Sequence, residues 1–302
     1  MTTNTEKYIH QIESLIQQDP GNRFFTSVIQ CSQLLASSSR LMHDHRILIV
    51  TGFCILDTMT GETDGPPGAL VLGNALSALG KEVTYVTDDY SYKLLQHGMK
   101  HYPLTIKSPI ISITKEDTYE EIASLLKEFK PDHIIAIERP GIAKDGKTYS
   151  MRGERLDHVI PQLDMMLDPP FERCYSTTAI GDGGNEMGLG SFYDKIAASV
   201  PLGRLIATTT PADYVIPAGI SNWGGYAVAG VLSILSGKSL FPPEGTERKV
   251  VTTMVDAGGV DGCIKQGIVS VDGIDFDLYL SVVQQISQMV NKALTDGKGG
   301  VT

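Results

Sequence analysis

The chain has 302 residues and a mass of 32.7 kDa, and 42% of its residues are hydrophobic and 20% charged. This length allows one large domain or two unequal ones, and the composition is ordinary for a globular protein. The net charge of −10 and the pI near 5.1 argue against a nucleic-acid partner, because no basic surface is available to neutralise a run of phosphates.

Cysteine usage and hydropathy indicate a reduced, cytoplasmic protein. The four cysteines, Cys31, Cys54, Cys174 and Cys263, stand far apart without paired spacing, so we predict free thiols rather than a disulfide or zinc framework. The N-terminus lacks the basic and apolar segments of a secretory signal, and no apolar run approaches the roughly 20 residues that span a bilayer. We expect no membrane partner, and the sequence leaves a homo-oligomer open.

Strand-like and helix-like segments alternate along the chain. The predicted strands are Arg46–Thr51, Glu82–Thr87, His133–Ile137, Cys174–Ile180 and Ala212–Pro217. The predicted helices are Thr5–Gln18, Phe24–Ser37, Gly65–Leu79, Tyr90–His97, Thr118–Phe129, His158–Leu167, Ser191–Val200, Ser221–Ser236, Glu244–Asp256 and Phe276–Leu294, with Ser221 as an N-cap. This alternation predicts an α/β fold, with a three-layer, mostly parallel, Rossmann-like sheet and flanking helices.

The same pattern divides the chain into three parts. We expect an N-terminal helical extension over residues 1–45, a single α/β domain over residues 46–295, and a flexible, glycine-rich tail over residues 296–302. The order of the strands cannot be read from the sequence.

The most informative segment is Ala179–Gly188, which places Asp182, Asn185 and Glu186 among several glycines. Glycine allows left-handed backbone conformations and lets a ligand approach main-chain amides. The segment follows a predicted strand and precedes a predicted helix, where open α/β sheets bind ligands. The alternative is an ordinary glycine-rich turn with solvated acids.

Polar motifs also follow the other predicted strands. They are Gly61–Gly68 with Glu62, Asp64 and Gly65, then Thr87–Asp89, then Glu138–Gly141 with Arg139, then Tyr149–Gly153 with Arg152, and finally Pro217–Gly224 with Ser221 and Asn222. Because the carboxyl ends of parallel strands lie at one edge of a sheet, these side chains predict one shared cleft.

Several of these residues have a structural alternative. Asp64 could cap the helix that follows it, a contribution of about 1 kcal/mol. Arg152 could be a free surface arginine, and Trp223 could simply pack. Asp256 and Asp261, which flank a pair of glycines, are expected to shape a helix end and a turn.

Arg139 is hard to explain as a solvated charge, because it directly follows a buried strand and precedes Pro-Gly. It could pair internally with Glu138, Asp182 or Glu186. Its planar guanidinium also suits bidentate capture of a substrate carboxylate, and this is the role that we expect.

A set of short motifs stands in a specific order along the chain. They are Thr51–Phe53, Glu62–Ala69, Glu138–Gly141, Met151–Gly153, Ile180–Gly188 and Asp256–Gly262. Each motif alone is weak, but the ordered set resembles the D-glutamate cyclase C-terminal domain family from about residue 46 to residue 294. The resemblance implies a lyase of D-amino acid metabolism that converts D-glutamate to 5-oxo-D-proline and water.

The implied reaction assigns roles to the strand-end residues. Cyclisation requires a deprotonated amine, neutralisation of the γ-carboxylate and assisted departure of hydroxide. The expected catalytic residues are Glu62, Asp182 and Glu186. The expected substrate-binding residues are Asp64, Gly65, Arg139, Arg152, Gly183, Gly184, Asn185, Ser221 and Asn222. A cofactor is not required by the sequence, but Asp64, Asp182 and Asn185 offer the hard oxygen ligands that suit Mg²⁺ or Mn²⁺.

Other classes of function compete with a cyclase. A nicotinamide dehydrogenase is rejected, because Gly181-Asp182-Gly183 is followed by Glu186 where a third glycine belongs. A P-loop enzyme is excluded for want of a Gly-Lys-Ser/Thr end. A metal-dependent phosphatase or nucleotide hydrolase and a non-enzymatic sensor that binds an amino acid remain as alternatives.

Overall fold

The computed structural model describes residues 3–23, 25–29, 32–105, 107–116 and 118–298. A six-stranded sheet has the order β5-β4-β1-β6-β7-β8, and all of its neighbouring strands are parallel. The strands are β1 Arg46–Thr51, β4 Glu82–Thr87, β5 Ile110–Ser112, β6 His133–Ile137, β7 Ser176–Gly181 and β8 Tyr214–Pro217. A short antiparallel pair, β2 Cys54–Ile55 and β3 Thr60–Gly61, lies between β1 and the next helix.

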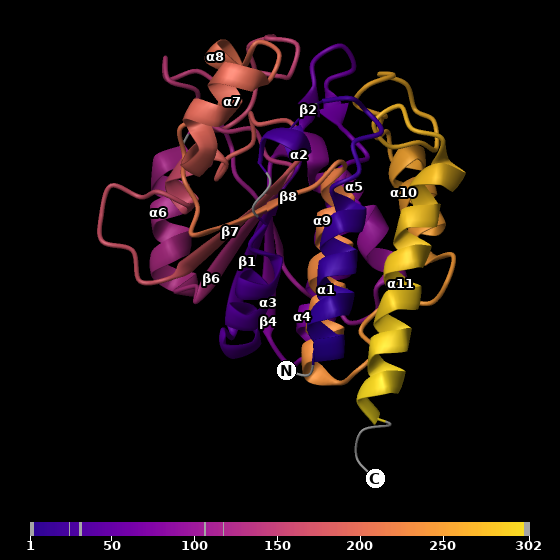
Figure 1. Cartoon of the computed structure of the whole chain (residues 1–302). Helices are drawn as coiled ribbons and strands as arrows, with labels where there is room; N and C mark the ends of the chain where they lie inside the picture. Colours follow the sequence, from indigo (N-terminus) through magenta and orange to yellow (C-terminus); the bar gives the residue numbers. More distant parts are fainter. Residues whose placement is uncertain (1–2, 24, 30–31, 106, 117, 299–302) are drawn as a thin grey trace.

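Helices cover both faces of this sheet (Figure 1). They are α1 Thr3–Ile16, α2 Phe25–Val28, α3 Leu34–His43, α4 Pro66–Ala78, α5 Asp89–Gly98, α6 Thr118–Phe129, α7 Tyr193–Ser199, α8 Gly203–Ile206, α9 Ser221–Ser236, α10 Thr246–Asp256 and α11 Phe276–Lys298. The largest core joins one face to α1, α3, α4, α5, α9, α10 and α11. The opposite face packs against α6, α2, α7 and α8. The predicted three-layer α/β class is confirmed.

The central strands β1 and β6 are largely apolar because both faces of the sheet are covered. Ile47 and Ile49 of β1 point into the core with α4 and α9, while Leu48 and Val50 point to the core that contains α6. Parallel sheets buried on both sides require such continuous runs, and this is why β1, β4 and β6 begin and end where the sequence predicts.

Helices α4 and α9 pack closely because glycines stand at their contact. A Cβ atom on Gly225 would lie 2.4 Å from the carbonyl oxygen of Gly68, and a Cβ atom on Gly68 would lie 2.8 Å from the Cα of Asn222. Both distances are too short for real atoms, so the two helix starts are held against each other at this edge of the sheet.

We therefore expect Gly225→Ala to reduce the free energy of unfolding by about 1–3 kcal/mol, because an inserted methyl group must push the helices apart. Urea denaturation followed by circular dichroism measures the change. The matched control is Gly297→Ala near the end of α11, where no atom lies within 4 Å of the new Cβ. A Gly225→Ala protein as stable as the control would contradict this account of the contact.

The N-terminal helices differ from the prediction of one helix over Phe24–Ser37. Helix α2 ends at Val28 and α3 begins at Leu34, while residues 24, 30 and 31 lie outside the described residues. Between them the chain passes the edge strand β8, where Gln33 N donates to Val215 O at 3.1 Å. A single straight helix is wrong because Phe25 packs with the α7 side of the sheet and Leu34 with the α9 side.

A second predicted helix, His158–Leu167, is also wrong. This segment forms turns and a single 3₁₀ turn at Asp164–Met166. Pro161 removes a helical donor within it, and its carbonyl accepts a hydrogen bond from Arg139 Nη2 at 2.7 Å. At the other end of the chain α11 continues to Lys298, so residues 296–298 of the expected tail are helical and residues 299–302 lie outside the described residues.

A row of buried polar side chains joins α3 to the sheet. His133 Nδ1 lies 2.8 Å from Asp44 Oδ2, and His133 Nε2 lies 2.7 Å from Thr178 Oγ1. Thr178 Oγ1 in turn lies 2.7 Å from Ser37 Oγ. All four side chains are buried, so each polar group is satisfied inside the protein.

A second buried polar cluster surrounds Glu247 at the start of α10. Its carboxylate accepts hydrogen bonds from Tyr226 Oη at 2.7 Å and from Tyr279 Oη. Burial raises the pKa of Glu247 to about 7. The folded protein therefore holds this proton at a pH where the unfolded chain releases it.

The sign of the resulting pH dependence follows from this raised pKa. The contribution of Glu247 to stability is complete below its unfolded pKa and falls as the pH rises toward about 7. A shift of this size corresponds to a loss of about 3 kcal/mol. We expect Glu247→Gln to remove that slope from the pH profile of urea unfolding, whereas the exposed Glu244→Gln control keeps it. Identical profiles for Glu247→Gln and the wild type would count against the buried proton.

Candidate functional site

A pocket opens at the carboxyl edge of the sheet, above β1, β6 and β7. Its cavity volume is about 90 Å³, well below the roughly 300–1,000 Å³ of sites for drug-sized ligands, so it suits a compact metabolite. Its polar lining comes from segments that are distant in the sequence. These lining residues are Arg23, Glu62, Glu138, Ser150, Arg152, Glu154, Cys263, Lys265 and Asp272.

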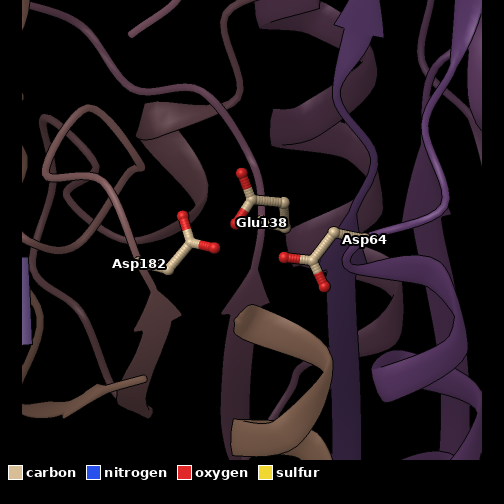
Figure 2. A group of neighbouring side chains, drawn as sticks. All are labelled: Asp64, Glu138 and Asp182. Atoms are coloured by element: carbon tan, nitrogen blue, oxygen red, sulfur yellow. The ribbon is translucent and has the colours of Figure 1, made fainter. Parts of the chain in front are cut away.

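Three buried carboxylates converge beside this pocket, and Figure 2 shows them pointing toward one another. Asp64 follows the β2–β3 pair, Glu138 follows β6 and Asp182 follows β7. One ligand oxygen from each residue lies within 4.8 Å of the other two. Glu138 belongs both to this group and to the pocket lining, whereas Asp64 and Asp182 lie deeper. We call these residues the acidic trio.

Asp64 is fixed by the start of α9 rather than by the helix that follows it in sequence. Its two carboxylate oxygens accept hydrogen bonds from Ser221 N at 2.9 Å and Asn222 N at 2.8 Å. In return, Asn222 Oδ1 accepts from Gly65 N at 2.9 Å and Gly68 N at 2.8 Å at the start of α4. The start of α9 is thus capped by Asp64 from the segment before α4, and the start of α4 by Asn222 of α9. The Gly65 amide, expected to bind substrate, has a protein partner.

Ser221 is the first residue of α9 and not its N-cap, which is Ile220. The Ser221 hydroxyl donates to Glu138 Oε2 at 2.5 Å. Glu138 itself has a positive φ of 45°, which is rare for a residue with a side chain. The strand end therefore carries local backbone strain at the residue whose carboxylate lies with those of Asp64 and Asp182.

Glu186 shapes the glycine-rich loop from within. Its Oε1 accepts from Asp182 N at 3.0 Å and from Gly183 N at 2.8 Å, and its Oε2 accepts from Gly184 N at 2.7 Å. The amides of Gly183 and Gly184, which we expected to bind substrate, are occupied by this carboxylate. Asn185 lies alongside and donates from Nδ2 to Tyr149 O at 2.9 Å. Glu186 therefore positions Asp182, and it does not line the pocket.

Arg139 also differs from its expected place. Its side chain is 0% exposed, it forms an ion pair with Asp88, and it donates to Gly52 O at 3.0 Å and Pro161 O at 2.7 Å. The guanidinium does not line the pocket, and its Nη groups bond instead to Asp88 after β4, to Gly52 after β1 and to Pro161 before the 3₁₀ turn. The charge is matched inside the protein by Asp88, a partner that the sequence does not suggest.

Other residues singled out in the sequence have structural contacts. Arg152 lies at the exposed rim of the pocket, where Nη2 donates to Cys263 O at 2.9 Å. Trp223 stacks on Tyr279 with ring centroids 6.0 Å apart. Asp261 accepts hydrogen bonds from Cys263 N at 2.9 Å and other groups of its own loop, so it shapes a turn as expected.

Two residues of the site were not predicted from the sequence. Arg23 comes from the segment between α1 and α2, and Asp272 comes from the loop between α10 and α11. Arg23 Nη1 pairs with Asp182 Oδ1, and Arg23 Nη2 lies 2.9 Å from Asp272 Oδ1. Only tertiary packing brings these segments to the strand ends, so no local pattern marks them.

The site carries an excess of buried carboxyl groups over cations. Burial raises the pKa of Glu62, Glu138 and Asp182 well above the usual range, and it raises the pKa of Asp64 to about 8. Neighbouring carboxylates, with Asp272 among them, raise these pKa values further. A bound cation would relieve this repulsion.

Comparisons with known proteins confirm the resemblance seen in the motifs. A family model described as "D-glutamate cyclase-like, C-terminal" matches residues 12–287. The mitochondrial D-glutamate cyclase of Homo sapiens is 35% identical over 246 residues, which are 78% of this chain and 40% of the human protein. The chain thus spans less than half the length of that relative. In the part of the chain that the structure describes, no helix has the length and apolar character to cross a membrane.

Proposed function

The chain belongs to the family of D-glutamate cyclase-like C-terminal domains, and we propose that it is an enzyme that converts D-glutamate to 5-oxo-D-proline and water. The observation that carries the proposal is the buried acidic trio beneath a compact pocket at the sheet edge.

The cysteines that the structure describes, Cys54, Cys174 and Cys263, are free, and we propose the cytoplasm as the location.

The chemistry requires that protons move from nitrogen to oxygen. The ammonium group of D-glutamate loses one proton, and its nitrogen attacks the γ-carboxyl carbon to form the new C–N bond. A second nitrogen proton is lost as the tetrahedral carbon collapses. One γ-oxygen breaks its C–O bond and leaves as water with both protons, so atoms and charge balance without ATP.

Glu62 is the carboxylate best placed to take the first proton. It lines the pocket and is 5% exposed, so a substrate amine can reach it. Glu186, the other candidate base in the sequence, has both oxygens occupied by loop amides. We therefore assign the base role to Glu62 and a positioning role to Glu186.

We propose that the acidic trio holds a divalent cation, Mg²⁺ or Mn²⁺. The donor set fits, because carboxylate oxygens are the ligands that these hard ions prefer. Asp182 is 1% exposed, and its Oδ2 has no partner while its Oδ1 pairs with Arg23, so a metal ligand role would explain the free oxygen. In this group Glu138 stands where we expected Asn185 to be the third ligand. A bound ion would supply positive charge for the γ-carboxylate oxygens.

One experiment tests the reaction. Purified protein is incubated with D- or L-glutamate, with Mg²⁺, with Mn²⁺ or with EDTA, and 5-oxoproline is measured by chiral mass spectrometry. We expect product from D-glutamate, and we expect EDTA to suppress it. No product under any metal and pH condition would refute the cyclase. Thermal stabilisation by D-glutamate without turnover would support a sensor instead.

The phosphatase alternative has less support in this site. Phosphate sites use free backbone amides at loops and helix starts. Here the amides of Gly183, Gly184 and Gly65 bond to Glu186 and Asn222. A phosphate-release assay on common phosphomonoesters, run beside the cyclisation assay, is expected to give no signal.

A further inference from the structure

We propose that Arg23 binds the α-carboxylate of the substrate, so that the segment between α1 and α2 completes the active site. This inference rests on the proposed cyclisation and deepens it, since it names the group that recognises the non-reacting end of the substrate.

Arg23 differs from the other arginines near the site in where its charge lies. Its side chain is 17% exposed and lines the pocket, and it pairs with Asp182 of the trio and with Asp272 of the pocket lining. Arg139 is fully buried away from the pocket. Arg152 sits at the rim and donates to the Cys263 carbonyl. Within the described residues, Arg23 is the cation that reaches both the pocket and the trio.

The segment that carries Arg23 is firmly docked. Arg23 N donates to Asp19 Oδ1 at 2.9 Å, and Gly219 N donates to Ile16 O at 2.8 Å. A Cβ atom on Gly219 would lie 1.7 Å from Gln18 O, so the end of α1 and the β8–α9 loop touch backbone to backbone. A guanidinium held this way is preorganised, as a residue that orients substrate must be.

The charges of the pocket explain why the substrate needs this arginine. D-Glutamate carries two carboxylates and one ammonium group, and the pocket is walled by Glu62, Glu138 and Asp272. These acids repel an anion. The guanidinium has five N–H donors, so it can bind a carboxylate while it stays paired with aspartate. With the α-carboxylate on Arg23, the amine is left for Glu62 and the γ-carboxylate for the trio.

The test compares D-glutamate with its α-amide, D-isoglutamine, which can form the same ring but lacks the α-carboxylate. We expect the wild type to prefer D-glutamate strongly. In Arg23→Gln the KM for D-glutamate should rise about 10- to 100-fold, the range for a lost hydrogen bond to a charged group, while kcat changes less. The preference over D-isoglutamine should shrink by a similar factor, and Arg23→Lys should recover part of it.

Controls separate recognition from folding. Arg155→Gln, at an exposed arginine that pairs with Asp157, should keep wild-type kinetics. If Arg23 is merely structural, Arg23→Gln will lose activity on both substrates equally, and that result would overturn the assignment. Thermal unfolding of each variant checks that the comparison uses folded protein.

A binding measurement keeps the inference testable if the wild type does not cyclise D-glutamate. Calorimetric titration with glutarate, a dicarboxylate without the amine, should show about 10- to 100-fold weaker binding to Arg23→Gln than to the wild type. If glutarate binding weakens in this way but the wild type shows no turnover, the proposed reaction is refuted. The role of Arg23 in binding a carboxylate is then still supported. Equal affinities, or no glutarate binding to either protein, would overturn the role of Arg23.

Discussion

Asp182→Asn is expected to lose nearly all turnover and still fold. Asp182 lies in the acidic trio and anchors Arg23, so the substitution weakens both the proposed cation site and the proposed carboxylate site. Loss of one preorganised charged group in an active site lowers kcat by about 10²- to 10³-fold. The measurement is 5-oxoproline formation by folded variant and wild type at saturating D-glutamate and Mn²⁺.

The stability of the same variant should move in the opposite direction. Asp182 is buried, its pKa is raised by burial, and its Oδ2 has no partner while its Oδ1 pairs with Arg23. A neutral amide removes the repulsion from Glu138, while Arg23 keeps Asp272 as a partner. We expect Tm to stay level or rise, as is common when a strained functional group is replaced. The control is Asp194→Asn, at an exposed position of α7. An active Asp182→Asn enzyme would exclude Asp182 from the site.

Glu186→Gln is expected to reduce the free energy of unfolding by about 2–4 kcal/mol, because a side-chain amide cannot accept from all the N–H groups that the carboxylate serves. The side-chain NH₂ of the glutamine would replace one of the two carboxylate oxygens. It would then point either at the N–H of Gly184 or at the N–H groups of Asp182 and Gly183, and these donors would lose their acceptor. Urea unfolding measures this loss, with the exposed Glu172→Gln as the matched control.

The kinetics of Glu186→Gln should also differ from those of a missing base. The sequence suggests a loss of turnover with substrate binding less affected. The structure predicts that kcat and KM change together, because the displaced loop carries Asp182 and thereby moves Arg23. A stable Glu186→Gln protein in which kcat alone is lower would restore the base role and argue against the positioning role.

The strands β1, β4 and β6 were predictable because their environment is uniform, whereas the short strands β2, β3 and β5 were not predicted. Residues such as Ile47 to Val50 are buried on both faces of the sheet, so their apolar, β-branched character depends little on what covers them. Helix ends were less predictable where tertiary contacts decide them. Gln33 leaves helical geometry to bond the free edge of β8, and nothing in the sequence around it marks that edge.

In the site, too, some residues could be predicted from their place in the sequence, and others are placed only by tertiary contacts. Asp182 follows the strand β7, and Glu62 and Asp64 lie in the segment between β1 and α4, so their place after predicted strands indicated the carboxyl edge of the sheet. The contacts of Glu186 with residues two to four positions before it are local, and the spacing of an acid after consecutive glycines could have indicated them. Arg23 could not be found this way, because its partners lie more than a hundred residues away.

The buried row of Asp44, His133, Thr178 and Ser37 has the spacing of a hydrolase relay, with an acid on one imidazole nitrogen and a hydroxyl on the other. His133 begins β6 and Thr178 lies in the first half of β7, so the row lies on the side of the sheet away from the pocket edge, and its side chains are at most 4% exposed. A search by triad geometry alone would therefore select the wrong end of this molecule. Serine-directed phosphonates should leave the folded protein unlabelled, because these hydroxyl groups have no access to solvent. Their role is structural: they hold α3 against the sheet by hydrogen bonds.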